Sequence, residues 1–166
     1  MGPGSADARV WTADGKPTGI VFSRHRGDVL QVVSKDPENA WIVGTTSDDG
    51  TVRVWDARNG RQLAVLDAGV PLSSVAFSPN GRLLAAGSPD GYIRIWDWKQ
   101  QELLAAMKLH ADFVNSVAFS PDSRWILSAS DDRTAKLYHC TTCGPIEALE
   151  QRVSARRRPL AALDGR

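Results

Sequence analysis

Two cysteines near the end of the sequence are the residues with the clearest potential for chemistry. Cys140 and Cys143 stand in Cys-Thr-Thr-Cys-Gly, directly after His139. A two-residue spacer before glycine is the geometry of half a zinc site, but four ligands are needed and only His139 is close in sequence. A pair of structural thiols or a disulfide is a second interpretation. Thiol redox chemistry beside a helix that starts at Pro145 is a third, although no thioredoxin-like βαβ pattern surrounds the pair.

No other arrangement of residues in the sequence requires an enzyme. The histidines are His25, His110 and His139. Several serines fall in Ser-Pro turns, and none has a matching histidine and aspartate in a nucleophile arrangement. The pairs Asp48-Asp49 and Asp131-Asp132 lie in tight turns, and no ligand ladder of the EF-hand type accompanies them. We therefore expect no enzymatic activity and no cofactor.

A ten-residue segment occurs three times in the sequence, and it indicates which elements position the histidines and aspartates. Residues 47–56 read Ser-Asp-Asp-Gly-Thr-Val-Arg-Val-Trp-Asp, and they recur closely as 88–97 and more divergently as 130–139. The aromatic residue near the end of each copy repeats after 41 and then 42 residues. Residues 8–11 form the remainder of a fourth copy, whose tryptophan lies 44 residues before that of the first complete copy.

Each period contains four short apolar runs separated by turn residues. In the turn Ser-Pro-Asn-Gly at 78–81, proline presets φ, asparagine tolerates left-handed backbone and glycine takes positive φ. Asp-Gly closes a second hairpin, and residues 92–96 alternate as a strand does. The sequence predicts strands near 8–11, 18–22, 29–33, 40–45, 51–55, 62–66, 72–77, 82–87, 92–97, 102–107, 114–119, 124–129 and 134–138.

A period of this size that ends in Trp-Asp resembles the repeat of the WD-repeat β-propeller family. The resemblance covers roughly residues 5–139. It implies an all-β fold, a partial propeller of about three and a half four-stranded antiparallel blades with a short C-terminal helix. We expect a leader and half-blade at 1–23, a first complete blade at 24–66, a middle blade at 67–107, an incomplete last blade at 108–139, and a Cys-x-x-Cys and helical basic tail at 140–166.

The resemblance also implies a buried polar tetrad in each blade. In this relay an indole N–H meets a hydroxyl, the hydroxyl meets an imidazole and the imidazole meets a carboxylate. The tetrad residues are His25, Thr45, Asp49 and Trp55 in the first complete blade, and His110, Ser128, Asp132 and Tyr138 in the last blade. His25 and His110 are therefore expected to be structural, and tyrosine takes the place of tryptophan in the last blade.

The middle blade departs from this pattern. Ala68 and Ala86 occupy the histidine and hydroxyl positions, so Asp90 and Trp96 remain without those partners. A buried polar group without a partner costs about 1–3 kcal/mol, unless water or the amides of the turn compensate. We therefore expect the middle blade to be the loosest, with the fastest amide exchange.

Members of the resembled family bind partners through the face whose loops enter the innermost strands. Transferred by register, the residues expected on that face are Asp28, Leu30, Asp48, Pro71, Ser73, Pro89, Phe113, Asn115 and Asp131. They form an acidic rim with a few apolar anchors. Such a rim suits a protein or peptide with basic residues, so the leading function is that of a protein-interaction module, a scaffold or sensor platform.

The tail after the last repeat has a different character. Residues 145–158 read as a helix with Ile146, Leu149 and Val153 on one face, which we expect to cover the open edge of the last blade. Nucleic-acid binding through Arg152 and residues 156–158 is an alternative function, and it predicts salt-dependent binding. The tail also resembles the C-terminal end of large bacterial WD-repeat proteins that carry an upstream signal-transduction nucleotidase, although this sequence has no Gly-Lys-Ser/Thr phosphate loop.

Length and composition bound these interpretations. The chain has 166 residues, whereas a propeller needs about 4–8 blades to close, so we expect a piece of a longer protein or a ring completed by a second copy or another propeller half. An open arc is the third and least favoured interpretation, because it leaves hydrophobic blade faces exposed. The net charge of +1 gives no field that would attract nucleic acid or anionic lipid. No apolar run approaches a membrane span, and two cysteines in an ordinary composition favour the reducing cytoplasm.

Overall fold

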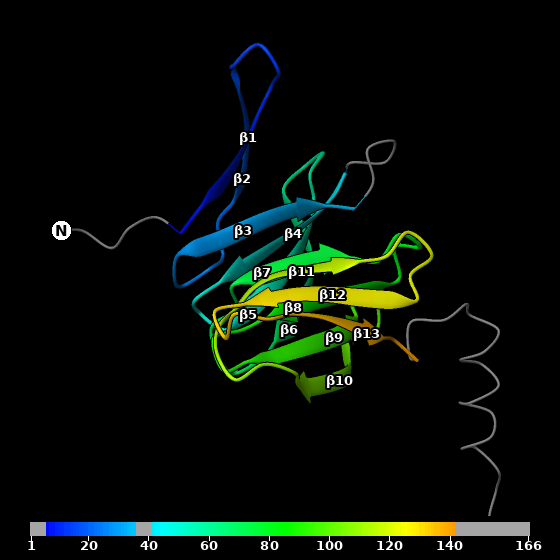
Figure 1. Ribbon diagram of the computed structural model, residues 1–166. Coiled ribbons are helices and arrows are strands. Elements are labelled where there is room, and N and C mark those ends of the chain that lie inside the picture. The colour runs from blue at the N-terminus through cyan, green and yellow to red at the C-terminus, as the bar shows by residue number, and fades with distance from the viewer. Residues whose placement is uncertain (1–5, 36–40, 142–166) are drawn as a thin grey trace, which may run out of the picture.

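The computed structural model describes residues 6–35 and 41–141, and every regular element in these two ranges is a β-strand. Thirteen strands form four antiparallel sheets (Figure 1). The first sheet is a hairpin of β1 (Ala8–Trp11) and β2 (Pro17–Phe22). The first complete blade follows as β3 (Val29–Ser34), β4 (Ile42–Ser47), β5 (Thr51–Asp56) and β6 (Arg61–Asp67).

The next two sheets repeat the same order along the chain. The middle blade contains β7 (Ser74–Phe77), β8 (Leu83–Gly87), β9 (Tyr92–Asp97) and β10 (Glu102–Lys108). The last blade contains β11 (Val114–Phe119), β12 (Trp125–Ser130) and β13 (Ala135–His139), and no fourth strand pairs with β13 in the described ranges. All thirteen strands begin and end within two residues of the predicted limits. The predicted helix at 145–158 lies outside the described residues.

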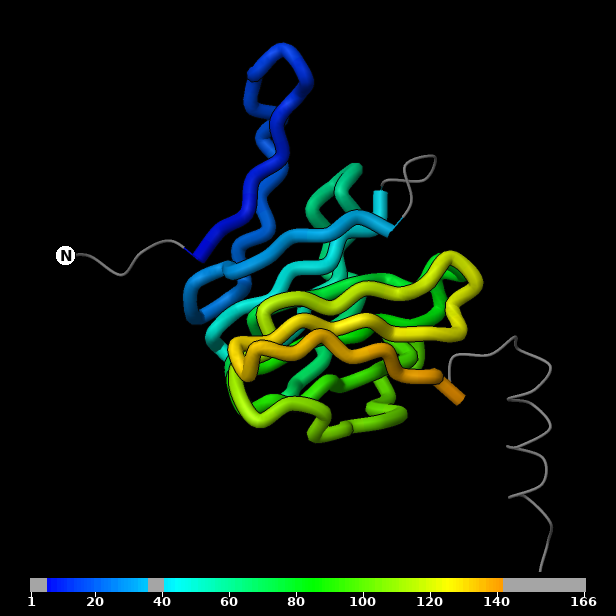
Figure 2. The backbone as a smooth tube through the Cα atoms, viewed as in Figure 1, coloured from blue at the N-terminus to red at the C-terminus, as the bar shows by residue number. Residues whose placement is uncertain are grey.

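The blades are arranged with their first strands side by side. β7 lies between β3 and β11, while β6 and β10 form the outer edges of their sheets (Figures 1 and 2). Every blade has its loops at two ends. We call the end that carries the tetrad aspartates the tetrad face, on the left in Figure 2, and the end of the Ser-Pro turns the opposite face.

The core consists of apolar layers between neighbouring sheets. Val52, Leu66, Val75 and Trp96 belong to the layer between the first and middle blades. The middle blade is therefore covered on both sides, and β8 is buried at all five positions. β12 alternates between exposed and buried residues, because only one side of the last blade has a neighbour.

Tight turns at the tetrad face join the second and third strands of each blade. Gly50 and Gly91 take φ of +85° and +81° there, and Arg133 takes +66° at the equivalent position of the last blade. A Cβ on Gly91 would lie 2.2 Å from the carbonyl oxygen of His110, a distance that real side chains do not adopt. Glycine at 91 therefore lets the turn of the middle blade pack against the loop that enters the last blade.

Candidate functional site

The tetrad residues of the first complete blade form one continuous relay. Trp55 Nε1 donates to Thr45 Oγ1 at 2.9 Å, and Thr45 Oγ1 lies 2.7 Å from His25 Nε2. His25 Nδ1 lies 3.0 Å from Asp49 Oδ2. Because the Thr45 hydroxyl accepts from the indole, its own proton is directed to Nε2, which leaves the imidazole proton on Nδ1 to be donated to Asp49.

Charge in this relay is confined to the aspartate. Burial acts to raise the pKa of Asp49, but hydrogen bonds from Thr51, the Arg26 N–H and His25 outweigh it and hold the pKa well below its usual range. The two Thr51 donors lie 2.7 and 2.9 Å from Asp49 Oδ1. Burial lowers the pKa of His25, more than the neighbouring carboxylate raises it. The site therefore pairs an ionised carboxylate with a neutral imidazole.

The last blade forms a shorter version of the relay. His110 Nδ1 lies 2.8 Å from Asp132 Oδ2, and His110 Nε2 lies 2.8 Å from Ser128 Oγ. Hydrogen bonds from Thr134 are the main reason why the pKa of Asp132 is lowered. Tyr138 is half-buried, and none of the hydrogen bonds among the described residues joins it to Ser128. The relay therefore ends at the serine.

The middle blade corrects one expectation from the sequence, because Asp90 is not left without a partner. Arg94 Nη2 lies 2.8 Å from Asp90 Oδ2, and Arg94 Nη1 donates to Ser88 Oγ at 2.6 Å. Burial acts to raise the pKa of Asp90, but Arg94, Ser88 and the Tyr92 N–H lower it to about 2. The guanidinium thus replaces the imidazole that Ala68 cannot supply.

The position of Arg94 in the repeat does not by itself predict its ion pair with Asp90. The equivalent Arg53 of the first complete blade points elsewhere, and its Nη1 donates to Gln62 Oε1 at 2.7 Å. Arg94 can turn toward Asp90 because the space of a histidine is vacant. The pairing could have been predicted from two features taken together, the absence of the histidine at position 68 and the arginine four residues after Asp90.

The structure leaves most of the residues expected on the tetrad face exposed, and their role in binding stays a prediction. The exposed ones are Asp28, Leu30, Asp48, Pro71, Pro89, Asn115 and Asp131. Ser73 and Phe113 are half-buried. The hydroxyl of Ser73 donates to the backbone carbonyls of Gly87 and Val114, so this residue joins the middle and last blades.

The exposed carboxylates give this face its chemical character. Asp48 and Asp28 are linked through the backbone, since Asp48 N donates to the Asp28 carbonyl at 3.2 Å. Asp131 accepts a hydrogen bond from Asn115 Nδ2 at 2.5 Å. A Cβ on Gly27 would lie 1.8 Å from Asp48 Oδ1, so a side chain at position 27 would displace this carboxylate. Exposed carboxylates of this kind can accept charge-assisted hydrogen bonds from lysine or arginine side chains.

The cysteine motif is only half described by the structure. Cys140 is 2% exposed and packs in the apolar layer with Leu83, Val117 and Ile126. Cys143 lies outside the described residues, as do Arg152 and residues 156–158 of the tail. Within the described ranges, no three His, Cys, Asp or Glu side chains are grouped to hold a metal ion. Cys140 is disulfide-bonded in the structure, which agrees with the disulfide interpretation of the motif, while the zinc and redox roles and the role of the basic tail stay predictions.

Repeated antiparallel sheets, two of which carry a buried His–Asp relay, define a protein built from propeller blades. The family model described as "WD domain, G-beta repeat" matches residues 15–56, 60–97 and 101–139. The chain belongs to the WD-repeat family, whose members act as interaction scaffolds. In the described ranges, no helix is long and apolar enough to cross a membrane.

Curated relatives agree with this family. A U3 small nucleolar RNA-associated protein 15 homolog of Xenopus tropicalis is 28% identical over 79% of this chain and 25% of its own length. A guanine nucleotide-binding protein subunit beta of Arabidopsis thaliana is 41% identical over 51% of this chain and 24% of its own length. A histone acetyltransferase type B subunit 2 of Candida glabrata is 32% identical over 72% of this chain and 29% of its own length. The chain thus spans about a quarter of the length of such relatives.

Proposed function

We propose that this chain is a protein-interaction module that binds a basic peptide or protein segment across its tetrad face. The observation that supports this function is the row of exposed carboxylates, Asp28, Asp48 and Asp131, held on the rigid ends of two blades. The relays beneath them fix the loops, because Asp49 and Asp132 each accept a backbone N–H from the loop that enters the blade. Loops fixed in this way lose little conformational entropy when a ligand binds.

The binding experiment compares variants of the exposed carboxylates with a matched variant elsewhere. Asp28→Asn, Asp48→Asn and Asp131→Asn together remove three charges without touching the relays. We expect a library of lysine- and arginine-rich peptides to lose at least tenfold in affinity, because each lost charge-assisted hydrogen bond is worth about 1.5–3 kcal/mol. Glu102→Gln removes an exposed charge at the outer strand β10 and serves as the control. Equal binding by the triple variant and the wild type would contradict the proposal.

In the wider protein, we place this module at the sensor or scaffold end of a larger cytoplasmic chain. The support is the likeness of the tail to bacterial WD-repeat proteins with an upstream signal-transduction nucleotidase, together with the quarter-length match to the curated relatives. Sequencing the gene on both sides of this segment tests the placement. Further WD periods with a phosphate-loop motif are expected upstream, and a stop codon or an unrelated domain in their place would contradict it.

A further inference from the structure

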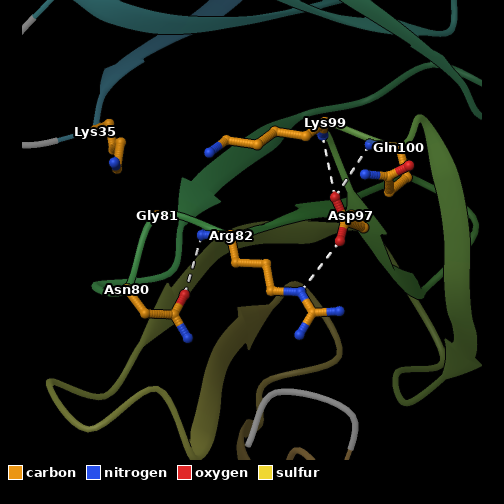
Figure 3. A pocket seen from close by; sticks show the side chains of 7 residues that line it. All are labelled: Lys35, Asn80, Gly81, Arg82, Asp97, Lys99 and Gln100. Carbon is orange, nitrogen blue, oxygen red and sulfur yellow. Dashed lines mark hydrogen bonds and ion pairs between the residues drawn. The ribbon is translucent and has the colours of Figure 1, made fainter. Parts of the chain in front are cut away.

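A pocket on the opposite face is lined mainly by cationic and polar side chains, whereas the tetrad face carries exposed carboxylates. It encloses about 490 Å³ and is lined by Lys35, Asn80, Gly81, Arg82, Asp97, Lys99 and Gln100 (Figure 3). Lys35 comes from the end of β3 in the first complete blade, and the other residues come from two turns of the middle blade. The pocket therefore lies where two blades meet, and its volume is in the range of small-ligand sites.

Among the described residues that line the pocket, Asp97 is the only carboxylate, and it already has its partners. Arg82 Nε donates to Asp97 Oδ2 at 3.1 Å, while the backbone N–H groups of Lys99 and Gln100 donate to Asp97 Oδ1 at 3.1 Å each. Arg82 Nη1 is buried and lacks a hydrogen-bond partner in the described part of the chain. The carboxylate is thus held in place and leaves part of the guanidinium unpaired.

The two lysines add charge that this carboxylate does not neutralise. Neither Lys35 nor Lys99 forms an ion pair among the described residues. The Lys35 side chain lies against Gly81, where a Cβ would be 1.7 Å from Lys35 Cε. Figure 3 shows the Lys99 side chain extending toward Lys35 over the same turn. The described residues of the lining contribute three cationic side chains and one carboxylate, a formal charge of two positive.

The equivalent turn of the first complete blade shows that this excess charge is not a general consequence of the repeat. There Arg58, at the position of Lys99, itself binds Asp56 through Nε at 2.9 Å and Nη2 at 2.7 Å. In the middle blade, Arg82 binds the aspartate, and the Lys99 ammonium lies 5.7 Å from the centre of the Trp98 ring without an ion pair among the described residues. Asn80 adds a further donor, because its Oδ1 accepts from Ser78 Oγ and Arg82 N and its Nδ2 remains available.

We propose that this pocket binds a phosphate monoester, through the ammonium groups of Lys35 and Lys99 and the guanidinium of Arg82. A phosphate monoester carries a charge of about −1.5 to −2 at neutral pH and three acceptor oxygens, which match the charge and the donors of the lining better than a single carboxylate does. The site is independent of the basic segment proposed for the tetrad face, since the two lie at opposite ends of the blades.

The test uses the purified chain with two probes, inorganic phosphate and a short phosphoserine peptide, followed by calorimetry at 0.15 M salt. We expect Lys35→Ala and Lys99→Ala each to weaken phosphate binding by about tenfold or more, since each removes a charge-assisted contact. Both side chains are peripheral, and an unchanged circular dichroism spectrum and melting temperature verify the fold. Lys108→Ala, which removes an exposed lysine from β10, is the charge-matched control and is expected to bind as the wild type does.

The peptide identifies the source of the phosphate. Tighter binding of the phosphoserine peptide than of inorganic phosphate, with none by the unphosphorylated peptide, supports a phosphorylated partner segment. Equal binding of both phosphate probes supports a small phosphorylated ligand. Absence of phosphate binding to the wild type, or equal losses in Lys35→Ala, Lys99→Ala and Lys108→Ala, would overturn the proposal.

Discussion

A single hydroxyl joins the two halves of the relay in the first complete blade. Thr45 is fully buried and contacts both the Trp55 indole and the His25 imidazole. Thr45→Val keeps the shape but leaves both nitrogens without their partner, so we expect the free energy of unfolding to fall by about 2–4 kcal/mol. Urea denaturation measures this loss. Ser128→Ala is the matched variant in the last blade, where only His110 loses a partner, and a loss as large as that of Thr45→Val would contradict this account.

The neutral state of His25 makes stability depend on pH. Burial lowers the pKa of His25 from its ordinary value of 6.5, so below pH 6.5 the unfolded chain binds a proton that the folded chain resists. The free energy of unfolding is therefore expected to decrease as the pH falls from 7.5 to 5.5. Urea denaturation at several pH values gives the slope, and His25→Gln is expected to flatten it in this window. A slope that persists unchanged in the variant would assign the effect to another group.

A second pH window belongs to the ion pair of the middle blade. The pKa of Asp90 is lowered to about 2 in the folded chain, from an ordinary value of 3.8. The stabilisation from its ionised form is complete above pH 3.8 and is lost as the pH falls toward 2. Asp90→Asn is expected to reduce the loss of stability between pH 4 and 2, measured by thermal unfolding. Arg94→Met is expected to do the same, because the folded-state pKa then rises toward its ordinary value.

At the scale of the element, the turn between β12 and β13 contains a non-glycine residue in the left-handed backbone conformation. Arg133 adopts φ of +66° where the other two blades have glycine. A residue with a Cβ pays about 1–2 kcal/mol in this conformation. We therefore expect Arg133→Gly to raise the free energy of unfolding by about 1 kcal/mol, measured in urea. The reverse change at the equivalent turn, Gly91→Ala, brings a Cβ against the His110 carbonyl and is expected to destabilise strongly.

Burial reverses the expectation that the middle blade is the loosest. β9 is buried at five of six positions, whereas four of the five residues of β13 are exposed. Native-state hydrogen exchange is expected to be slower in β8 and β9 than in β12 and β13, because exposed edge strands open more readily. Faster exchange in the middle blade would restore the original view that its missing tetrad residues dominate.

The strands could be predicted from the local sequence, whereas the Arg94–Asp90 pair and the pocket at Lys35 could not. The strand limits followed from apolar runs and turn residues, which act within a few positions. The pairing of Arg94 with Asp90 depended on a side-chain torsion and on the space left by Ala68. The pocket depended on Lys35 meeting the turns of the next blade. Interactions between residues far apart along the chain, or decided by a rotamer, have no periodic signal.

At the scale of the whole molecule, the first complete blade and the last blade expose apolar side chains of a kind that the middle blade buries. On the last blade, Leu127 and Leu137 are 47% and 60% exposed, and at the other end Leu30 and Val32 of β3 are 50% and 52% exposed. Neighbouring blades inside the chain bury such side chains against each other. Burial of a leucine side chain is worth about 1.5–3 kcal/mol. The exposed side of the first complete blade and the exposed side of the last blade, here called the two ends of the array of blades, therefore both favour contact with a further sheet.

The two ends are different surfaces, so association of identical chains through them must run head to tail. We expect the purified chain to self-associate with increasing concentration, measured by sedimentation velocity. Leu127→Ser with Leu137→Ser should leave mainly monomers, as should Leu30→Ser with Val32→Ser. Since each double variant retains one intact end, mixing the two is expected to restore dimers but no larger species. Monomers in the mixture would show that the two ends do not contact each other, and a monomeric wild type would show that neither end drives association of this chain with itself.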